Sequence, residues 1–200
     1  TWDWAEKLRL VKAAHAANPE GRDAWYGVMM GSILAGDTVS AINMAKRIYQ
    51  SGDIASGIYD LNYNMLQSVG EHGILFTNGD LDTMPAWVLQ LVKKIRTDVL
   101  VVTLALAYGN RDYLAQSLRQ HNIQLSERLR SDKKISRETF YAELANELRR
   151  GNASLPIHFT VTVFESSLRE IQNNLYLTGL THEFSEERPD VLARLRLNFE

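Results

Sequence analysis

Carboxylate and amide side chains stand directly after two apolar segments of this sequence. Their positions are Asn78, Asp80, Asp82, Asn110 and Asp112. Such oxygen atoms bind divalent cations and the hydroxyl groups of sugars. The carboxyl ends of parallel strands meet at one edge of a sheet, where open α/β proteins bind their ligands. If both segments are parallel strands, these five side chains form a ligand-binding site, to which Glu165 adds an acid after a third strand.

A local explanation competes for the stretch "GILFTNGDLDTMPAWVLQ", residues 73–90. Asn78 and Gly79 favour a turn with positive φ, and Asp80 or Asp82 can accept hydrogen bonds from the free amides at a helix start. Such a cap contributes about 1 kcal/mol. The D-x-D spacing alone does not distinguish a cap from a ligand site.

Other chemistries leave no pattern in the sequence. There is no cysteine, no H-E-x-x-H, no phosphate-binding or dinucleotide-binding glycine loop, and no G-x-S-x-G nucleophile elbow. We therefore expect no cofactor and no resident metal, and the sequence assigns no catalytic residue.

The carboxy-terminal part, residues 71–200, alternates between strand and helix patterns. Strands are predicted at 74–76, 99–107, 157–163 and 180–184, and helices from Pro85 (capped by Asp82 or Thr83), at 110–120, at 136–150 and at 166–178. The run "VLVVTLALA" at 99–107 has the continuous apolar character of a strand covered on both faces. This order predicts an α/β domain with a small, mainly parallel sheet and helices on both faces.

The amino-terminal part, residues 1–70, shows helix patterns only. Trp25, Gly36 and Ala41 occupy the aromatic, small and alanine positions of a tetratricopeptide unit, and Tyr59 lies one repeat period after Trp25. A generic helical hairpin explains the same pattern. Because fewer than three repeats are present, we expect this helical, tetratricopeptide-like part to pack on the α/β domain.

Composition and charge narrow the possible partners. The 200 residues are 45% hydrophobic and carry a formal net charge of −2, which predicts a folded protein that binds no nucleic acid. The basic residues of 128–150 alternate with acidic ones, as on a solvated helical face. No apolar run reaches the roughly 18 residues that a transmembrane helix needs.

Two stretches resemble a known family. They read "GILFTNGDLDTMPAWVLQLVKKIRTDVLVVTLALAYGNRDYL" and "LPIHFTVTVFESSLREIQNNLYLTGLTHEF". Over roughly residues 73–185 the sequence is similar to the soluble carboxy-terminal region of multispanning membrane proteins of Bacteroidota related to protein O-mannosyltransferases. The shared features are a strand ending in T-N-G-D, a proline-aromatic helix start, an R-x-D-V strand and an L-x-L-x-G-L ending. Leu81 departs from the family, which usually has a polar residue there, and this removes one possible ligand.

The resemblance implies an extracytoplasmic or periplasmic, membrane-associated and glycan-linked setting, without implying catalysis by this chain. We therefore predict a non-catalytic interaction or ligand-binding module with a protein partner and, as a second ligand class, a glycan. Two alternatives stay open. One is a metal-assisted transferase or hydrolase that uses Asp80, Asp82 and Asp112, and the other is a structural helical-repeat scaffold.

Overall fold

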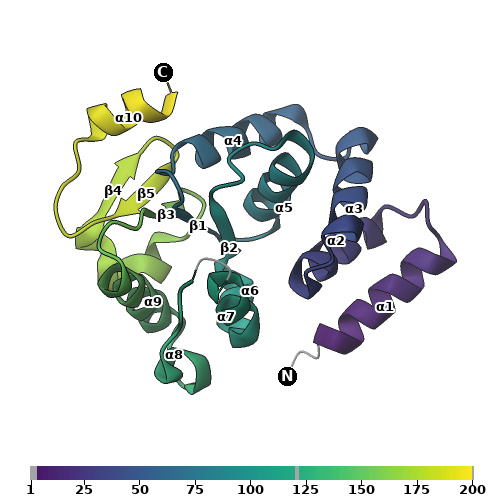
Figure 1. Ribbon diagram of the computed structural model, residues 1–200, viewed down its shortest axis with the longest axis horizontal. Helices are drawn as coiled ribbons and strands as arrows, with labels where there is room; N and C mark the ends of the chain where they lie inside the picture. Colours follow the sequence, from purple (N-terminus) through teal and green to yellow (C-terminus); the bar gives the residue numbers. More distant parts are fainter. Residues whose placement is uncertain (1–3, 120–121, 200) are drawn as a thin grey trace.

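Helices form the amino-terminal part of the chain, as the sequence predicts. The computed structural model describes residues 4–119 and 122–199, and its first elements are α1 (Trp4–Ala17), α2 (Asp23–Ala35), α3 (Thr38–Ser51) and α4 (Ser56–Gln67). Gly36 and Gly52 follow α2 and α3 with φ of 73° and 69°, the left-handed conformation in which glycine has no Cβ penalty. Figure 1 shows α1–α3 on one side of the molecule and the sheet on the other, with α4 between them.

A five-stranded sheet forms the other side of the molecule. Its strands are β1 (Ile74–Thr77), β2 (Leu100–Thr103), β3 (Ile157–Thr160), β4 (Leu175–Thr178) and β5 (Thr181–Phe184), in the order β2-β1-β3-β5-β4. β1 pairs in parallel with β2 and β3, whereas β5 pairs antiparallel with β3 and β4. The predicted α/β class is confirmed, and the β4–β5 hairpin makes the sheet mixed.

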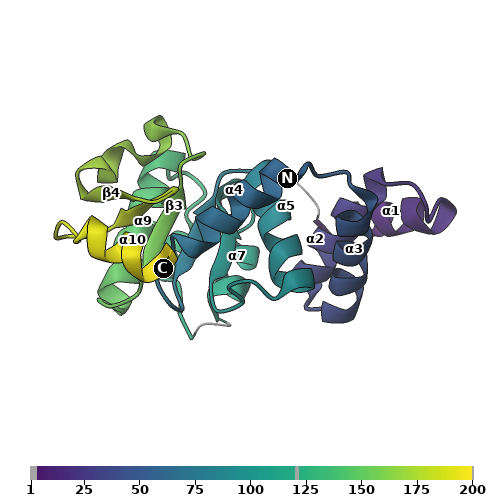
Figure 2. The same cartoon turned by 90° about the horizontal axis from the view of Figure 1, so that it is seen from above.

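Helices cover both faces of this sheet. They are α5 (Asp80–Val88) with a π-helical turn η1 (Leu89–Lys93), α6 (Leu104–Gly109), α7 (Arg111–Arg119), α8 (Glu127–Ser131), α9 (Arg137–Gly151), the 3₁₀ helix η2 (Glu165–Asn174) and α10 (Val191–Phe199). Phe76 and Phe159 stack at 5.2 Å in the core on the α7 and α9 face, whereas Leu75 faces a second core under α2–α5. Figure 2 shows the same arrangement from above.

The apolar run 99–107 is not one strand. β2 ends at Thr103, opposite the last residue of β1, and α6 begins at Leu104. A short apolar run fits a buried strand and a buried helix equally well, so its composition could not place this break. β2 lies at the edge of the sheet, yet Val101 and Val102 are both buried, so the expected cover on both faces is present.

The helix after β1 begins at Asp80, five residues before the predicted start at Pro85. Proline inside a helix cannot donate to the carbonyl four residues earlier. Here that carbonyl belongs to Leu81, and it accepts a hydrogen bond from Asn62 Nδ2 on α4 at 3.0 Å instead. A side chain distant in sequence therefore supplies the bond that Pro85 cannot make.

Three further differences concern the carboxy-terminal elements. The helix predicted over 166–178 ends at residue 174, and the strand β4 follows it. The turn between β4 and β5 holds Gly179 at a φ of 73°, a hairpin signal that the sequence reading did not use. The helix α10 was not predicted, and Gln120, the expected end of the helix after Asn110, lies outside the described residues.

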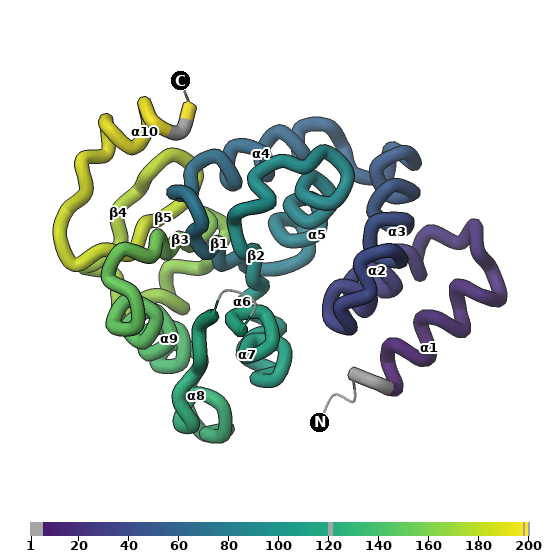
Figure 3. Tube along the Cα trace, viewed as in Figure 1, coloured from purple at the N-terminus to yellow at the C-terminus, as the bar shows by residue number. Residues whose placement is uncertain are grey.

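The helical part packs on the sheet, as expected. One core cluster joins Met29 and Ile48 of α2 and α3 to Leu75 of β1 and Trp87 of α5. The α2–α3 hairpin buries the predicted tetratricopeptide positions Trp25 and Ala41. α4 packs mainly against α5, however, so Tyr59 does not begin another stacked repeat. Figure 3 traces α4 running from the α2–α3 hairpin toward the sheet.

Candidate functional site: the sheet edge and two grooves

A row of threonines crosses the edge of the sheet at which β1, β2 and β3 end. In strand order they are Thr103, Thr77, Thr160, Thr181 and Thr178. Thr77 is the register partner of Thr103, and Thr181 is the partner of both Thr160 and Thr178. All five are buried. The edge that was expected to hold a ligand is therefore occupied by the protein's own hydroxyl groups.

Asp82 is the acid that meets this row. Its Oδ1 accepts a hydrogen bond from the backbone N–H of Gly79 at 2.8 Å, and its Oδ2 accepts one from the N–H of Asn78 at 2.7 Å. The same Oδ2 accepts from Thr160 Oγ1 at 2.8 Å and from Thr162 Oγ1. With 2% of its surface exposed, this carboxylate accepts hydrogen bonds from four protein donors, three of them at Oδ2. It joins the start of α5 to the end of β3.

The local explanation of the Asn-Gly-Asp stretch is therefore right for Asp82 and wrong for the turn. Asp82 lies at the third position of α5 and reaches back to the amides before the helix, a common arrangement at helix starts. Gly79 has a φ of −160°, which is extended backbone open to any residue. Asn78 does not have a positive φ either.

Asp80 points to a different place. It is exposed and makes no hydrogen bond or ion pair with any residue that the structure describes. It lines a groove of about 520 Å³ between α2, the α3–α4 connection, α4 and α5. We call this the Asp80 groove; its residues are Tyr26, Asp53, Ile54, Ala55, Ile58, Asp80, Leu81, Met84 and Pro85.

Asn110 and Asp112 lie together at a second groove, of about 230 Å³, between α7 and the α1–α2 pair. Asn110 Oδ1 accepts a hydrogen bond from the N–H of Tyr113 at 3.1 Å and so caps α7. Asp112 is exposed and has no hydrogen-bond or ion-pair partner among the described residues. Leu8, Met30 and Leu34 form apolar walls, and Gln116 adds a second amide. We call this the Asp112 groove.

The five predicted residues are thus divided among three places. Asn78 and Asp82 belong to the closed sheet edge, Asp80 to one groove, and Asn110 with Asp112 to another. Within 4–119 and 122–199, no group of three histidine, aspartate or glutamate side chains is placed to hold a metal ion. Glu165 begins η2, five residues beyond the end of β3, and is exposed.

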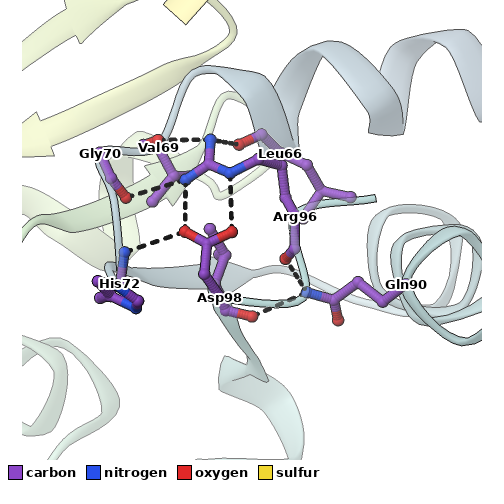
Figure 4. Close-up of polar contacts among 8 residues, drawn as sticks. Leu66, Val69, Gly70, His72, Gln90, Arg96 and Asp98 are labelled. Carbon is purple, nitrogen blue, oxygen red and sulfur yellow. Dashed lines mark hydrogen bonds and ion pairs between the residues drawn. The ribbon is translucent and has the colours of Figure 1, made fainter. Parts of the chain in front are cut away.

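The R-x-D motif of the resemblance forms a hydrogen-bond network that the sequence pattern alone does not predict (Figure 4). Arg96 Nε and Nη2 donate to the two oxygens of Asp98 at 3.0 and 2.9 Å. Its remaining donors reach three backbone carbonyls at the end of α4: those of Leu66, Val69 and Gly70, at 3.0, 2.8 and 3.1 Å. The Leu66 and Gly70 carbonyls also accept backbone N–H groups, from Val69 at 3.3 Å and Gly73 at 3.2 Å, whereas Arg96 is the donor to Val69 among the described residues. Because carbonyls at a helix end lack intrahelical partners, the guanidinium completes their bonding and fastens the end of α4 to the segment before β2. We call these contacts the Arg96 clip.

Two groups near the sheet have strongly shifted pKa values. The hydrogen bonds from Arg96 lower the pKa of Asp98 to about 2. Burial lowers the pKa of His158 to about 3, so this histidine is neutral. Its Nδ1 lies 2.9 Å from Thr181 Oγ1, which itself donates to the carbonyl of Thr178. The Thr181 hydroxyl thus lies between the His158 ring and the Thr178 carbonyl, at 2.9 and 3.2 Å.

These elements define the class of protein: an α/β domain with a closed polar sheet edge, fastened to a helical hairpin and flanked by two grooves. Residues 58–128, a little over a third of the chain, match the family model described as TMEM260-associated domain 2, a domain of unknown function. The matched segment contains Asp82, the Arg96 clip and Asp112. No significant match is found among curated proteins or solved structures.

Proposed function

We propose that this chain is a non-catalytic ligand-binding module, and that the Asp112 groove is its ligand site. The observation that carries the proposal is the separation of the acids: Asp82 is saturated at the sheet edge, and Asp80 and Asp112 line different grooves. The metal-assisted alternative that would use Asp80, Asp82 and Asp112 together requires these groups around one reacting centre. In the Asp112 groove one carboxylate lies with the Lys7 side chain beside apolar walls, and this arrangement suits the orientation of a ligand.

The chemistry of the Asp112 groove suits a hydroxylated ligand. A carboxylate accepts hydrogen bonds from hydroxyl groups, and the Asn110 amide N–H₂ and the Gln116 amide can donate to them and accept from them. Leu8 and Met30 also line the groove, and such apolar surface binds the C–H face of a sugar ring or the body of a peptide. A glycan or a glycosylated peptide therefore fits this groove.

The proposed setting is a membrane-associated, glycan-linked system outside the cytoplasm. Its support is the resemblance to the soluble part of O-mannosyltransferase-related membrane proteins, together with the association with TMEM260 that the matched family's name states. No helix among the described residues is long and apolar enough to cross a membrane. In this proposal the chain presents a ligand or partner to a membrane-bound enzyme and performs no transfer itself.

Calorimetric titration with a glycosylated peptide and with the same peptide unglycosylated tests the proposal. We expect binding of the glycosylated form, at least tenfold weaker binding by Asp112→Asn, and no effect of Asp80→Asn, which makes the same chemical change in the other groove. Mass spectrometry after incubation with nucleotide sugars and Mn²⁺ should show no transferred sugar. Transfer or hydrolysis by the chain alone would overturn the non-catalytic assignment, and equal binding by the Asp112 variant would overturn the site.

A further inference from the structure

The Asp80 groove combines an apolar floor with an acidic lip. Ile54, Ile58 and Met84 line it, and none of its nine lining residues is basic. Asp53 is already paired, with Arg22 at 3.1 Å and with the Tyr26 hydroxyl at 3.2 Å. Asp80 has no such partner within the described part of the chain. A segment that fills this groove should therefore carry large apolar side chains next to an arginine or lysine.

Leu81 marks the same groove as an interaction surface. It lies on the first turn of α5, and 74% of its surface is exposed. An exposed leucine alone is ordinary, but Leu81 borders a groove whose floor is apolar as well. The two features together form a continuous apolar surface with one free carboxylate at its edge.

α10 has the complementary composition. Its sequence is "VLARLRLNF", which contains two arginines and no acidic residue. Leu192 and Leu197 are 68% and 75% exposed, and none of the helix side chains that the structure describes is buried. Arg194 pairs with Glu183 at 3.3 Å, whereas Arg196 is exposed and forms no ion pair within the described part of the chain.

One copy of the chain cannot bring these two surfaces together. Phe199 of α10 lies beside Gly179, and the adjacent Leu180 N–H donates to Ser68 Oγ at the end of α4. Ile58, in the first turn of α4, lines the Asp80 groove. The twelve residues of α4 span about 18 Å at 1.5 Å per residue. The helix α10 and the groove therefore lie toward opposite ends of α4, as Figures 1 and 2 also show.

We propose that α10 of one copy binds in the Asp80 groove of a second copy, so that the chain associates head to tail. The exposed leucines of α10 would cover the apolar floor and Leu81, and Arg196 would face Asp80. Contact surfaces of this kind are heterologous: each copy uses two different patches, and association continues until a ring closes or a filament grows. This assigns a partner, a second copy, to a groove separate from the proposed ligand site.

Sedimentation velocity over a concentration series tests the association. The average mass of the parent should rise above the 22.7 kDa of one chain. Leu81→Arg, which blocks the groove, and Leu197→Asp, which blocks the helix, should each stay at one chain mass at every concentration. Val39→Asp is the matched control, since Val39 is 71% exposed on α3, away from both surfaces, and it should associate like the parent. Thermal unfolding confirms that each variant is folded.

Mixing the two blocked variants separates this arrangement from others. The Leu81→Arg copy keeps its helix and the Leu197→Asp copy keeps its groove, so the mixture should form one-to-one pairs and nothing larger. Likewise, Asp80→Arg and Arg196→Asp should each reduce association, and should restore it when combined in one chain. A parent that stays at one chain mass up to millimolar concentration would overturn the proposal. So would loss of association in the helix variant only, because that pattern means symmetric helix–helix pairing.

Discussion

Two structural sites, the buried Asp82 and the partly buried Arg96 clip, use the same kinds of side chain as the surface grooves at Asp80 and Asp112, but in opposite ways. At the two structural sites the charged groups meet protein partners: four donors surround Asp82, and the donors of Arg96 reach one carboxylate and three carbonyls. In the grooves, Asp80 and Asp112 have no such partner within the described residues. Asp80 and Asp82 are two positions apart and of the same residue type. The direction of the side chain therefore decides which of them has a structural role and which lies open to a ligand.

The largest effect that this comparison predicts is at the Arg96 clip. Arg96→Ala would leave Asp98 without its cation and the Val69 carbonyl without a donor, and would remove one of the two donors at each of the Leu66 and Gly70 carbonyls. The Arg96 and Asp98 side chains are 18% and 25% exposed, so we expect a loss of about 2–4 kcal/mol in the free energy of unfolding. Urea unfolding measures it. Arg128→Ala, at an exposed pair with Glu143, should cost under about 1 kcal/mol; equal losses would show that the clip has no special role.

Asp82→Asn should have the next largest effect. Four donors converge on the carboxylate, and an asparagine offers one acceptor oxygen and presents an N–H₂ group to the others. We expect a loss of about 1–3 kcal/mol, because buried donors are left without acceptors. Asp80→Asn is the matched control and should stay within about 0.5 kcal/mol of the parent. A silent Asp82→Asn would mean that the bonds to Thr160 and Thr162 contribute little.

The neutral His158 predicts a loss of stability in mild acid. Burial lowers its folded pKa to about 3 from the ordinary 6.5, so the unfolded chain binds the proton more readily. Its contribution to the free energy of unfolding is complete above pH 6.5 and declines as the pH falls toward 3. Between pH 7 and pH 5 the decline is about 2 kcal/mol. His158→Asn, whose side-chain amide can still hydrogen-bond to Thr181, should flatten this part of the stability curve in denaturant titrations at several pH values.

Asp98 changes the stability of the fold in a separate, more acidic pH range. Its folded pKa of about 2 lies below the ordinary 3.8, so its contribution is complete above about pH 4 and is lost as the pH falls toward 2. The slope of the free energy of unfolding against pH should therefore be unchanged by Asp98→Asn between pH 7 and pH 5. A change there would indicate that the two groups are coupled.

The smallest stability effect is expected at the Asp112 groove. Asp112→Asn should change the free energy of unfolding by less than about 0.5 kcal/mol, because the side chain is exposed and has no partner among the described residues. Thermal unfolding checks this result. A loss comparable to that of Asp82→Asn would place Asp112 with the structural acids and remove the basis for a ligand site.

The sequence predicted the elements whose signal is local. The helix predicted at 136–150 is α9, at Arg137–Gly151, and Trp25 at the predicted aromatic position lies buried in the α2–α3 hairpin. The α/β class and the parallel pairing of β1 followed from the alternation of strand and helix patterns. The end of β2 at Thr103 could not be predicted in this way, because an apolar run does not indicate where the neighbouring strand ends.

The candidate site was harder to predict, since it depends on which side chains meet across long sequence separations. The bond from Thr160 to Asp82 spans 78 positions, and Asn62 reaches Leu81 across 19. The alternating pattern of "IHFTVTV" predicts a strand with one less apolar face, but it does not indicate that Thr160 and Thr162 meet Asp82. The R-x-D spacing was visible in the sequence, but the carbonyls that Arg96 binds have no sequence signal.

The strand order also has a consequence for how the chain folds. The pairing of Ile74 with Leu100 closes a loop of 26 residues, and that of His158 with Glu183 closes one of 25. The pairing of Ile74 with Ile157 closes a loop of 83 residues. Loops of the shorter kind close at lower entropic cost. We therefore expect the β1–α5–β2 unit and the β3–β5–β4 unit to form early and to dock along β1 and β3 late. Asp82 would hold its local amides before docking and receive Thr160 only afterwards, so removing that hydroxyl should speed unfolding and leave the folding rate nearly unchanged.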